Sequence, residues 1–350
     1  MLDCFELAAE LVDIPSESLD EKAIADVVEA RLAGCEWLEV ERLGHNVVAR
    51  TQLDRGQRLV IAGHLDTVPA NDNLGARVEG DLLYGLGACD MKGGLAAQIG
   101  TALAVPDPAV DVTYIFYAGE EVASEHNGLL HLFRDRPDLV VGDVALLGEP
   151  TSADIEAGCQ GTLRAHITYH GTRAHTARPW KGVNAIHRLG VALTRIAAYE
   201  ARRPVIDGCE YREAVQAVAV EGGIAGNVVP DRAKLVVNLR YAPDRSPEEA
   251  ETHLAELIGE CDEWEVPDHA VAAAPTLAHP LLSALIERNS LAVRAKLGWT
   301  DVARFAAHGI PAANFGAGEA AIAHTRDEFV SRGEIERVHA ALVDLVSAGA

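Results

Sequence analysis

The chain has 350 residues, 49% of them hydrophobic and 24% charged, with a formal net charge of −23. This length exceeds what one hydrophobic core usually serves, so we expect two domains. The acidic balance argues against nucleic acid or an anionic membrane as a partner, because both carry negative charge themselves. We find neither a run of about 18 apolar residues that could span a membrane nor the basic and apolar regions of a signal peptide. We therefore expect a cytoplasmic protein whose six cysteines stay reduced.

Helical and strand patterns alternate through the first part of the chain. In order, we predict helices within 1–33, strands at 36–41, 45–51 and 58–63, a polar hairpin-like stretch at 70–84, a helix at 93–103, and strands at 111–118 and 143–147. The strands at 58–63, 111–118 and 143–147 are short apolar runs, which are typical of buried strands in a parallel sheet.

The pattern changes at Gly161, where apolar and polar residues begin to alternate as in an antiparallel strand with one wet face. We predict a strand at 162–170, a helix at 184–199, strands at 214–220 and 233–241, a helix at 247–259 and a return linker at 267–280. The predicted fold is therefore α/β: a discontinuous catalytic domain, residues 1–161 and 270–350, has a mixed sheet flanked by helices. Residues 162–269 form a ferredoxin-like α+β insert with a β-α-β-β-α-β order.

A His and an Asp end the strand at 58–63. His64 and Asp66 are two residues apart, so both side chains lie on the same face of an extended chain. In open α/β sheets this carboxyl end of the strands is where sites form. A carboxylate beside a His is a common partner of a metal ligand, because it fixes the tautomer of the ring. An ordinary hydrogen-bonded His at a strand end explains the pair equally well.

Further acidic residues follow the next strands, and another His lies near the C-terminus. They are Asp90, Glu120, Glu121, Glu149 and His324. Any one carboxylate of this kind could simply cap a helix. Several together at one sheet edge repel one another unless cations are present. Zinc binds His nitrogen and carboxylate oxygen, so two Zn²⁺ account for the number of ligands and leave one carboxylate for proton transfer. Glu120 and Glu121 are adjacent, which suggests one on the metal and one above the attacking water.

Five motifs carry a resemblance to a known family: GHLDTVP (63–69), LGACDMKGG (86–94), AGEE (118–121), GEPT (148–151) and AHTRDE (323–328). In this order they resemble the dinuclear zinc amidohydrolases, which include aminoacylases, acetylornithine deacetylases, glutamate carboxypeptidases and succinyl-diaminopimelate desuccinylases. The resemblance implies a zinc-peptidase-like catalytic domain and two Zn²⁺ per subunit, with Co²⁺ as a possible replacement for Zn²⁺.

The resemblance also assigns the ligands and the catalytic residues. It implies one zinc on His64, Glu149 and Asp90, and the other on Glu121, His324 and the bridging Asp90. It makes Glu120 the general base, and it makes Asp66 the residue that orients His64. It further implies a cis peptide bond between Asp90 and Met91.

Insert residues gain roles from the same resemblance. His175 resembles a His that reaches the active site of a partner subunit, which implies a homodimer formed through the insert; a surface His near a helix start is the alternative. The substrate-binding candidates are Arg178, Asn227, Arg240, Thr300 and, in the glycine-rich loop 314–318, Gly316. Asp301 and Arg304 either line the pocket or form an ion pair on a helix face.

The substrate is expected to be a small molecule with several carboxylates, since Arg178, Arg240, Arg304 and Arg326 supply cations suited to carboxylates. EHNGL (125–129) and EAGCQG (156–161) most resemble the desuccinylase branch, which acts on N-succinyl-LL-diaminopimelate. An N-acetylornithine or acetyl-lysine-type deacylase is the nearest alternative. A metal-free binding relative or a carboxypeptidase is the alternative from a different class.

Overall fold

The computed structural model describes residues 2–350, which divide into two compact units. The first unit comprises the described residues up to Ala157, Pro275–Arg294 and Arg304–Ala350; the second comprises Gly158–Ala274 and Ala295–Ala303. Among residues 2–350, no helix combines the length and the apolar character that crossing a membrane requires.

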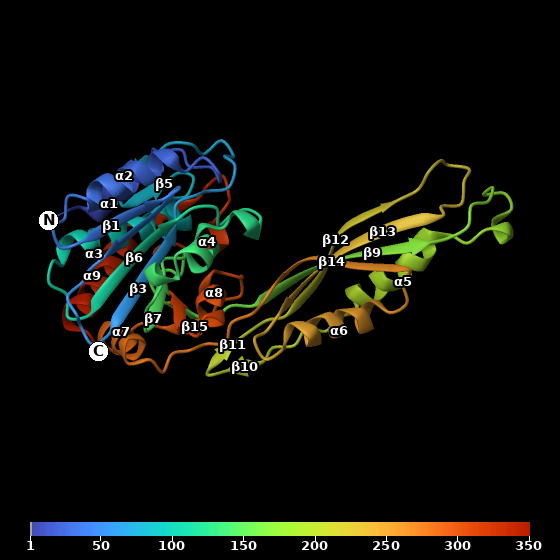
Figure 1. Cartoon of the computed structure of the whole chain (residues 1–350). Coiled ribbons are helices and arrows are strands. Elements are labelled where there is room, and N and C mark those ends of the chain that lie inside the picture. The colour runs from blue at the N-terminus through green and yellow to red at the C-terminus, as the bar shows by residue number, and fades with distance from the viewer. Residues whose placement is uncertain (1) are drawn as a thin grey trace. The chain divides into compact units, whose positions relative to one another are not determined.

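An eight-stranded mixed sheet forms the centre of the first unit, in the order β1-β2-β6-β3-β7-β16-β8-β15 (Figure 1). Its strands are β1(Glu39–Leu43), β2(Asn46–Arg50), β3(Arg58–His64), β6(Asp111–Tyr117), β7(Val144–Leu147), β8(Ile155–Ala157), β15(Val293–Ala295) and β16(Ala312–Asn314). β3 pairs in parallel with β6 on one side and with β7 on the other. These three strands are the apolar runs predicted from the sequence, and every residue of β6 and β7 is buried. The α/β class with a mixed sheet is confirmed.

Helices cover this sheet and share a hydrophobic core with it. The helices of the first unit are α1(Cys4–Val12), α2(Lys22–Leu32), α3(Gly93–Ala104), α4(Gly128–Asp135), α7(Pro280–Asn289), α8(Val302–Ala307), most of which belongs to this unit, and α9(Arg332–Ala348). Apolar residues of α1, α2, α3, α7 and α9 form one core cluster with the sheet. α4 and α8 pack on each other through Phe133 and Phe305, whose rings are 5.2 Å apart.

Short elements connect the sheet to the loops that carry the strand-end residues. They are β4(Arg77–Glu79), β5(Leu82–Tyr84), β17(Phe329–Ser331), and the short helical turns η1(Ala88–Lys92), η2(Ser124–His126), η3(Pro137–Leu139) and η5(Ala320–Ile322). α3 starts directly after η1. A Cβ on Gly94 would lie 2.4 Å from the carbonyl oxygen of Gly148. Only glycine therefore lets this helix approach the end of β7 so closely.

The second unit is built on an antiparallel sheet in the order β12-β13-β9-β14. Its elements are β9(Gly161–His170), η4(Pro179–Lys181), α5(Ala185–Ala197), β10(Val205–Ile206), β11(Cys209–Glu210), β12(Ala214–Gly222), β13(Arg232–Tyr241), α6(Pro247–Ile258) and β14(Glu263–Ala270). Alternate residues of β9 and β13 form a core with α5 and α6. α6 begins with a capping box, in which Ser246 and Glu249 each bond the backbone N–H of the other.

Several boundaries differ from the sequence-based expectation, since the main segment of the second unit is Gly158–Ala274 and the insert was expected at 162–269. The linker predicted at 267–280 is wrong in its first part, because β14 continues to Ala270. Pro267 concealed this strand, and it lies where the pairing of β14 with β9 shifts register. Residues 295–303, expected in the catalytic domain, belong to the second unit, where the carbonyl oxygens of Lys296 and Thr300 accept hydrogen bonds from Gln160 N and Cys159 Sγ.

Candidate metal centre

Three neighbouring strands of the first unit end at one edge of the sheet. His64 is the last residue of β3 and lies opposite Tyr117, the last residue of β6. Glu120 and Glu121 follow β6 within four residues, and the buried Glu149 follows β7 within two. Because the three strands are parallel, their carboxyl ends meet, and the side chains that follow them gather there.

The ring of His64 is held in a defined orientation. The side chain is 1% exposed, and Nδ1 lies 3.0 Å from the backbone oxygen of Asp66, to which it donates as N–H. Nε2 faces Asp90 Oδ1 at 3.1 Å. In the neutral ring this arrangement leaves Nε2 without a proton, as a metal ligand requires. Burial lowers the pKa of His64, but Asp90, Asp66 and Glu120 outweigh burial and raise it well above its ordinary value.

The Asp66 carboxylate contacts the backbone of the next strand end more closely than it contacts His64. Its Oδ1 accepts a hydrogen bond from Glu120 N and its Oδ2 one from Glu121 N, both at 3.0 Å. Ser18 Oγ donates to Oδ2 at 2.7 Å. The distance from Oδ1 to His64 Nδ1 is 3.6 Å. Asp66 thus orients His64 through its backbone carbonyl and orients Glu120 and Glu121 through its carboxylate.

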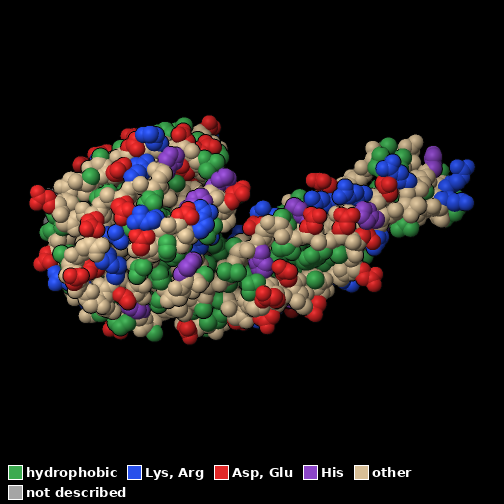
Figure 2. Space-filling view, viewed as in Figure 1, with side chains coloured by type: hydrophobic (Ala, Val, Ile, Leu, Met, Phe, Trp, Pro, Cys, Tyr) green, Lys and Arg blue, Asp and Glu red, His purple; other side chains and the backbone are tan. Residues whose placement is uncertain are grey.

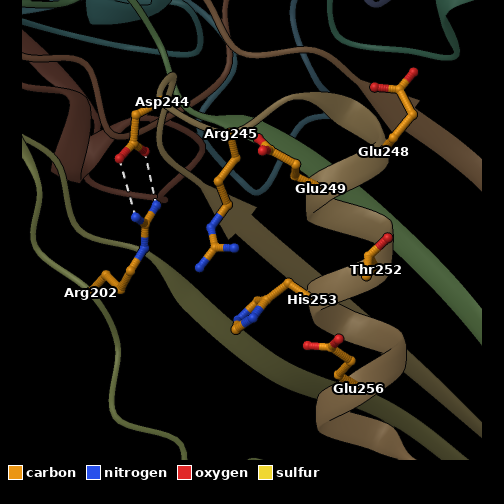
Figure 3. A pocket seen from close by; sticks show the side chains of 8 residues that line it. All are labelled: Arg202, Asp244, Arg245, Glu248, Glu249, Thr252, His253 and Glu256. Carbon is orange, nitrogen blue, oxygen red and sulfur yellow. Dashed lines mark hydrogen bonds and ion pairs between the residues drawn. The ribbon is translucent and has the colours of Figure 1, made fainter.

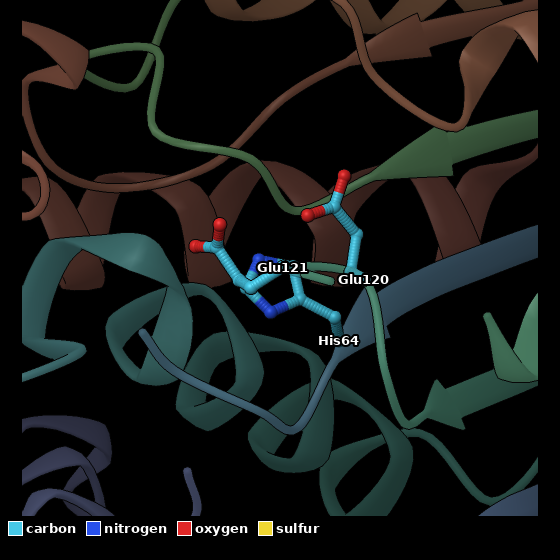
Figure 4. A group of neighbouring side chains, drawn as sticks. All are labelled: His64, Glu120 and Glu121. Atoms are coloured by element: carbon cyan, nitrogen blue, oxygen red, sulfur yellow. The ribbon is translucent and has the colours of Figure 1, made fainter. Parts of the chain in front are cut away.

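A bend brings the two adjacent glutamates to one place. Gly119 has φ +71°, in the left-handed region that glycine favours, and the chain turns there. His64, Glu120 and Glu121 each offer a ligand atom within 4.8 Å of the other two. Figure 4 shows the two carboxylates flanking the His64 ring. An extended chain would instead point the side chains of adjacent residues to opposite faces.

A second group joins Asp90, Glu121 and His324, whose ligand atoms also lie within 4.8 Å of one another. His324 Nε2 is 2.8 Å from Glu121 Oε1 and 3.4 Å from Asp90 Oδ2. Asp90 therefore faces one His with each carboxylate oxygen. The peptide bond between Asp90 and Met91 is cis, so that prediction is confirmed.

The electrostatics of the second group show a shortage of positive charge. Hydrogen bonds to Asp90 and Glu121 raise the pKa of His324 to about 10. Burial raises the pKa of Asp90, yet His324 and His64 outweigh burial and hold it well below its ordinary value. The ion pairs of Asp90 and Glu121 are with these two His residues alone, within residues 2–350. Without metal ions, protons on His64 and His324 are the positive charges that the described residues pair with these carboxylates.

These residues fit a metal ion. Imidazole nitrogens and carboxylate oxygens are the donors that divalent zinc and similar cations take. The two groups share Glu121, and Asp90 contacts the histidines of both. Glu149 is in neither group of the described residues, although it is 6% exposed and follows a strand that pairs with β3.

Supporting residues absent from the sequence-based prediction fix the ligand loops. Glu328 is 1% exposed, and its Oε1 accepts hydrogen bonds from Cys89 N at 3.0 Å and Asp90 N at 3.2 Å. Burial raises the pKa of Glu328. Asn73 Nδ2 donates to Thr325 O, beside His324. Glu328 stands in the AHTRDE motif, but only the folded chain shows that it holds the backbone of Asp90.

Comparison with known proteins decides the family. Residues 60–348 match the sequence model of peptidase family M20/M25/M40. The chain belongs to this family. A Mycobacterium tuberculosis protein named for succinyl-diaminopimelate desuccinylase, DapE, is 51% identical over 346 residues, covering 98% of this chain and 97% of that protein. The succinyl-diaminopimelate desuccinylase of Corynebacterium glutamicum is 46% identical over 356 residues, covering 99% and 96%.

Solved structures share the fold. A tripeptidase from Staphylococcus aureus matches with a TM-score of 0.80 at 20% identity. The match covers 99% of this chain and 97% of the tripeptidase chain. The Bacillus subtilis YXEP protein, described as a dinuclear metal binding peptidase of the M20 family, has a TM-score of 0.70 at 16% identity, with 98% and 97% covered. At these identities the likeness concerns the fold alone.

Of the substrate-binding candidates of this M20 chain, Gly316 lies in the first unit. A Cβ there would meet the carbonyl oxygens of Gly148 at 2.2 Å and Glu149 at 2.5 Å. Its N–H donates to Thr151 Oγ1 at 3.0 Å. Gly316 therefore packs against the strand end that carries Glu149. Arg304 donates to Ser124 Oγ, and Arg326 is exposed and 4.0 Å from Asp72.

The other candidates belong to the second unit of the M20 chain. His175 and Asn227 lie on adjoining segments, because His175 forms a β-bridge with Val228 and Thr176 N donates to Asn227 O. Arg178 is exposed on the same loop. Figure 2 shows the Lys, Arg and His side chains of this loop at the right end of the view. Thr300 is buried, and Arg240 is half-buried on β13 opposite Thr162.

Proposed function

We propose that this chain is a metal-dependent amide hydrolase that cleaves N-succinyl-LL-2,6-diaminopimelate with water, yielding succinate and LL-diaminopimelate. One observation supports the chemistry most: His64, Asp90, Glu120, Glu121 and His324 gather at one sheet edge with no Lys or Arg paired to Asp90 or Glu121, within the described chain. The near full-length identity of 51% and 46% to proteins named as desuccinylases supports the substrate.

Two Zn²⁺, or Co²⁺ in their place, are the proposed cofactors. His64, Glu149 and Asp90 would hold one ion, and Glu121, His324 and Asp90 the other. When bound, the ions would lower the pKa of a water molecule and polarise the amide carbonyl. The geometry of the His64 ring, with Nδ1 bonded to the Asp66 carbonyl, prepares Nε2 for this role.

Glu120 is the proposed general base. Its carboxylate takes a proton from the attacking water and then gives it to the leaving amine nitrogen. The backbone of Glu120 is held in place, because the Asp66 carboxylate accepts the N–H groups of both Glu120 and Glu121. In this proposal Glu120 transfers the proton and Glu121 binds metal.

His175 is proposed to stabilise the oxyanion in the partner subunit of a homodimer. The N–H of Ala177 donates to His175 Nδ1 at 3.0 Å, so in the neutral ring the proton lies on Nε2, as an oxyanion donor needs. The insert also offers a surface for a second copy. β12 is an edge strand of its sheet, and its Val218 and Val220 are 56% and 51% exposed.

Arg178, Asn227, Arg240 and Thr300 are proposed to bind the substrate. The guanidinium of Arg240 has no ion-pair partner among the described residues, and burial together with Arg164 lowers its pKa. An unpaired, half-buried Arg has most to gain from a carboxylate, and this substrate carries several. We place the reaction in the cytoplasm, where the six free cysteines would remain reduced.

A side-by-side assay of succinyl and acetyl substrates on the purified, zinc-loaded protein tests this function. We expect N-succinyl-LL-diaminopimelate to be hydrolysed at least about 100-fold more efficiently, by kcat/KM, than N-acetylornithine or N-acetyl-lysine, since a site built for a carboxylate rejects analogues lacking it. Preference for an acetyl substrate would make the chain a deacylase. Preference for a peptide would make it a carboxypeptidase, and no turnover with tight metal-free binding would make it a binding protein.

A further inference from the structure

A segment near the N-terminus runs beside the residues that follow β3. Ser18 N donates to Thr67 O at 3.1 Å, and Thr67 N donates to Ser16 O at 2.9 Å. Glu17 and Thr67 form a parallel bridge between these donors. The segment is therefore held by its backbone, and it presents the Ser18 hydroxyl to the Asp66 carboxylate at 2.7 Å.

The Asp66 carboxylate accepts hydrogen bonds on both of its oxygens. In the structure it accepts the N–H groups of Glu120 and Glu121, one on each oxygen. His64 Nδ1 is 3.6 Å from Oδ1, beyond hydrogen-bond distance, because it donates to the Asp66 backbone oxygen instead. The side chain of Asp66 is fully buried, so solvent cannot supply a missing donor. The Ser18 hydroxyl is the third donor, and it bonds the oxygen that also holds Glu121.

We infer that Ser18 is a positioning residue for proton transfer. Its hydroxyl holds the Asp66 carboxylate in the orientation that accepts the backbone N–H groups of Glu120 and Glu121. Ser18 acts through Asp66, and no hydrogen bond of Ser18 with Glu120 or Glu121 is present in the described structure. The inference rests on the proposed function, because it needs Glu120 to be the base. A shift of about 1 Å in a catalytic group can cost roughly 100-fold in rate. Weaker hydrogen bonds between Asp66 and the backbone of Glu120 should therefore lower kcat measurably.

Ser18→Ala tests the inference by kinetics on the holoenzyme. We expect kcat to fall by about tenfold while KM changes less than twofold, because the reacting geometry changes and substrate binding does not. Zinc content should remain that of the wild type. Ser18→Thr keeps the hydroxyl and should restore at least half of kcat. Ser16→Ala is the matched control, since Ser16 Oγ is buried on the same segment without a hydrogen-bond partner among the described residues.

A double mutant separates action through Asp66 from a general loss of structure. In an Asp66→Asn background, Ser18→Ala should change kcat by less than twofold, because the path from Ser18 to Glu120 is already broken. A tenfold further loss in that background would overturn the inference. A Ser18→Ala enzyme with kcat within twofold of the wild type would overturn it as well.

Hydrogen exchange of the metal-free protein gives a readout that needs no activity. Ser18→Ala should speed exchange at the amides of Glu120 and Glu121 by about tenfold, and Ser16→Ala should not. Unchanged protection would overturn the inference even in an active enzyme. If the wild type hydrolyses none of the acyl substrates but the exchange result holds, the proposed function fails while the hold of Ser18 on Asp66 stands.

Discussion

Two acidic clusters of this molecule, one in each unit, are balanced in opposite ways. In the second unit, the fully buried Glu213 lies 2.7 Å from Arg202 and 3.0 Å from Arg245, and it also accepts the N–H of Ala242. Asp244 pairs with Arg202 through both oxygens. These arginines line a pocket of about 420 Å³ (Figure 3). Here the chain itself supplies the positive charge.

At the strand ends of the first unit, the ion pairs of Asp90 and Glu121 are only with His64 and His324, within residues 2–350. A His balances a carboxylate only by taking a proton, which is why the pKa of His324 rises to about 10. The comparison teaches that buried carboxylates alone do not indicate a metal site. Among the described residues, Asp90 and Glu121 pair with no arginine, which distinguishes a place prepared for external cations from a structural ion pair.

Metal removal should have the largest effect of the changes considered, because of the two clusters only the one at the strand ends of the first unit is proposed to depend on external cations. Dialysis against a chelator should abolish amide hydrolysis and lower the midpoint of thermal unfolding, because carboxylates crowded without cations repel one another. Adding Zn²⁺ back should restore both, and elemental analysis should find two ions per chain. Full activity at metal contents below a tenth of an ion per chain would show that the strand-end cluster is not a metal centre.

Glu120→Ala should separate proton transfer from metal binding. We expect kcat to fall by about a thousandfold with two zinc ions still bound, since general acid–base catalysis contributes roughly 10²–10⁴-fold. Steady-state kinetics and metal analysis on the same preparation check both halves. A variant that keeps a tenth of the wild-type activity would remove Glu120 from this role.

The sequence was informative about part of this site because His64, Glu121 and Glu149 lie at or just after strands with a strong local signal, whereas the resemblance was needed to assign Asp90 and His324. The apolar runs ending at His64, Tyr117 and Leu147 predict parallel strands, and residues after such strands share one sheet edge. The bend at Gly119 was not predictable, because an extended chain and a turn fit AGEE equally well. It follows from Asp66, which is 54 residues away from Glu120 and accepts its N–H.

Long-range support was the part that sequence reasoning missed. Ser18 reaches Asp66 across 48 residues, and Glu328 reaches Asp90 across 238. No local pattern marks Ser18, and the AHTRDE motif that contains Glu328 does not show which backbone Glu328 holds, since Ser and Glu are usually solvent-exposed. Strand β14 was missed for a similar reason. Pro267 indicates a strand break unless the pairing of β14 with β9 is known.

Glu213→Ala tests the arginine-balanced cluster of the second unit, and it should lower the free energy of unfolding without affecting the metal site. Removing this carboxylate leaves Arg202 and Arg245 without their shared partner, which we expect to cost about 3 kcal/mol of unfolding free energy. Urea unfolding measures the loss, and zinc content should not change. Asp244→Asn is the control: it touches Arg202 from an exposed position and should cost under about 1 kcal/mol. Equal losses in the two variants would contradict the structural role of Glu213.

Acid should weaken the arginine-balanced cluster in a defined direction. Burial raises the pKa of Glu213, but Arg202 and Arg245 outweigh burial and hold it below its ordinary value of 4.5. A carboxyl with a lowered folded-state pKa stabilises the fold fully above its unfolded-state pKa, and that stabilisation is lost as the pH falls through the folded-state pKa. Unfolding free energies of the wild type and Glu213→Gln should therefore differ by a constant amount above about pH 5.5, and the gap should narrow below pH 4.5. A gap that stays constant down to pH 3 would mean that Glu213 is not held ionised by its arginines, and the contrast between the two clusters would lose its electrostatic basis.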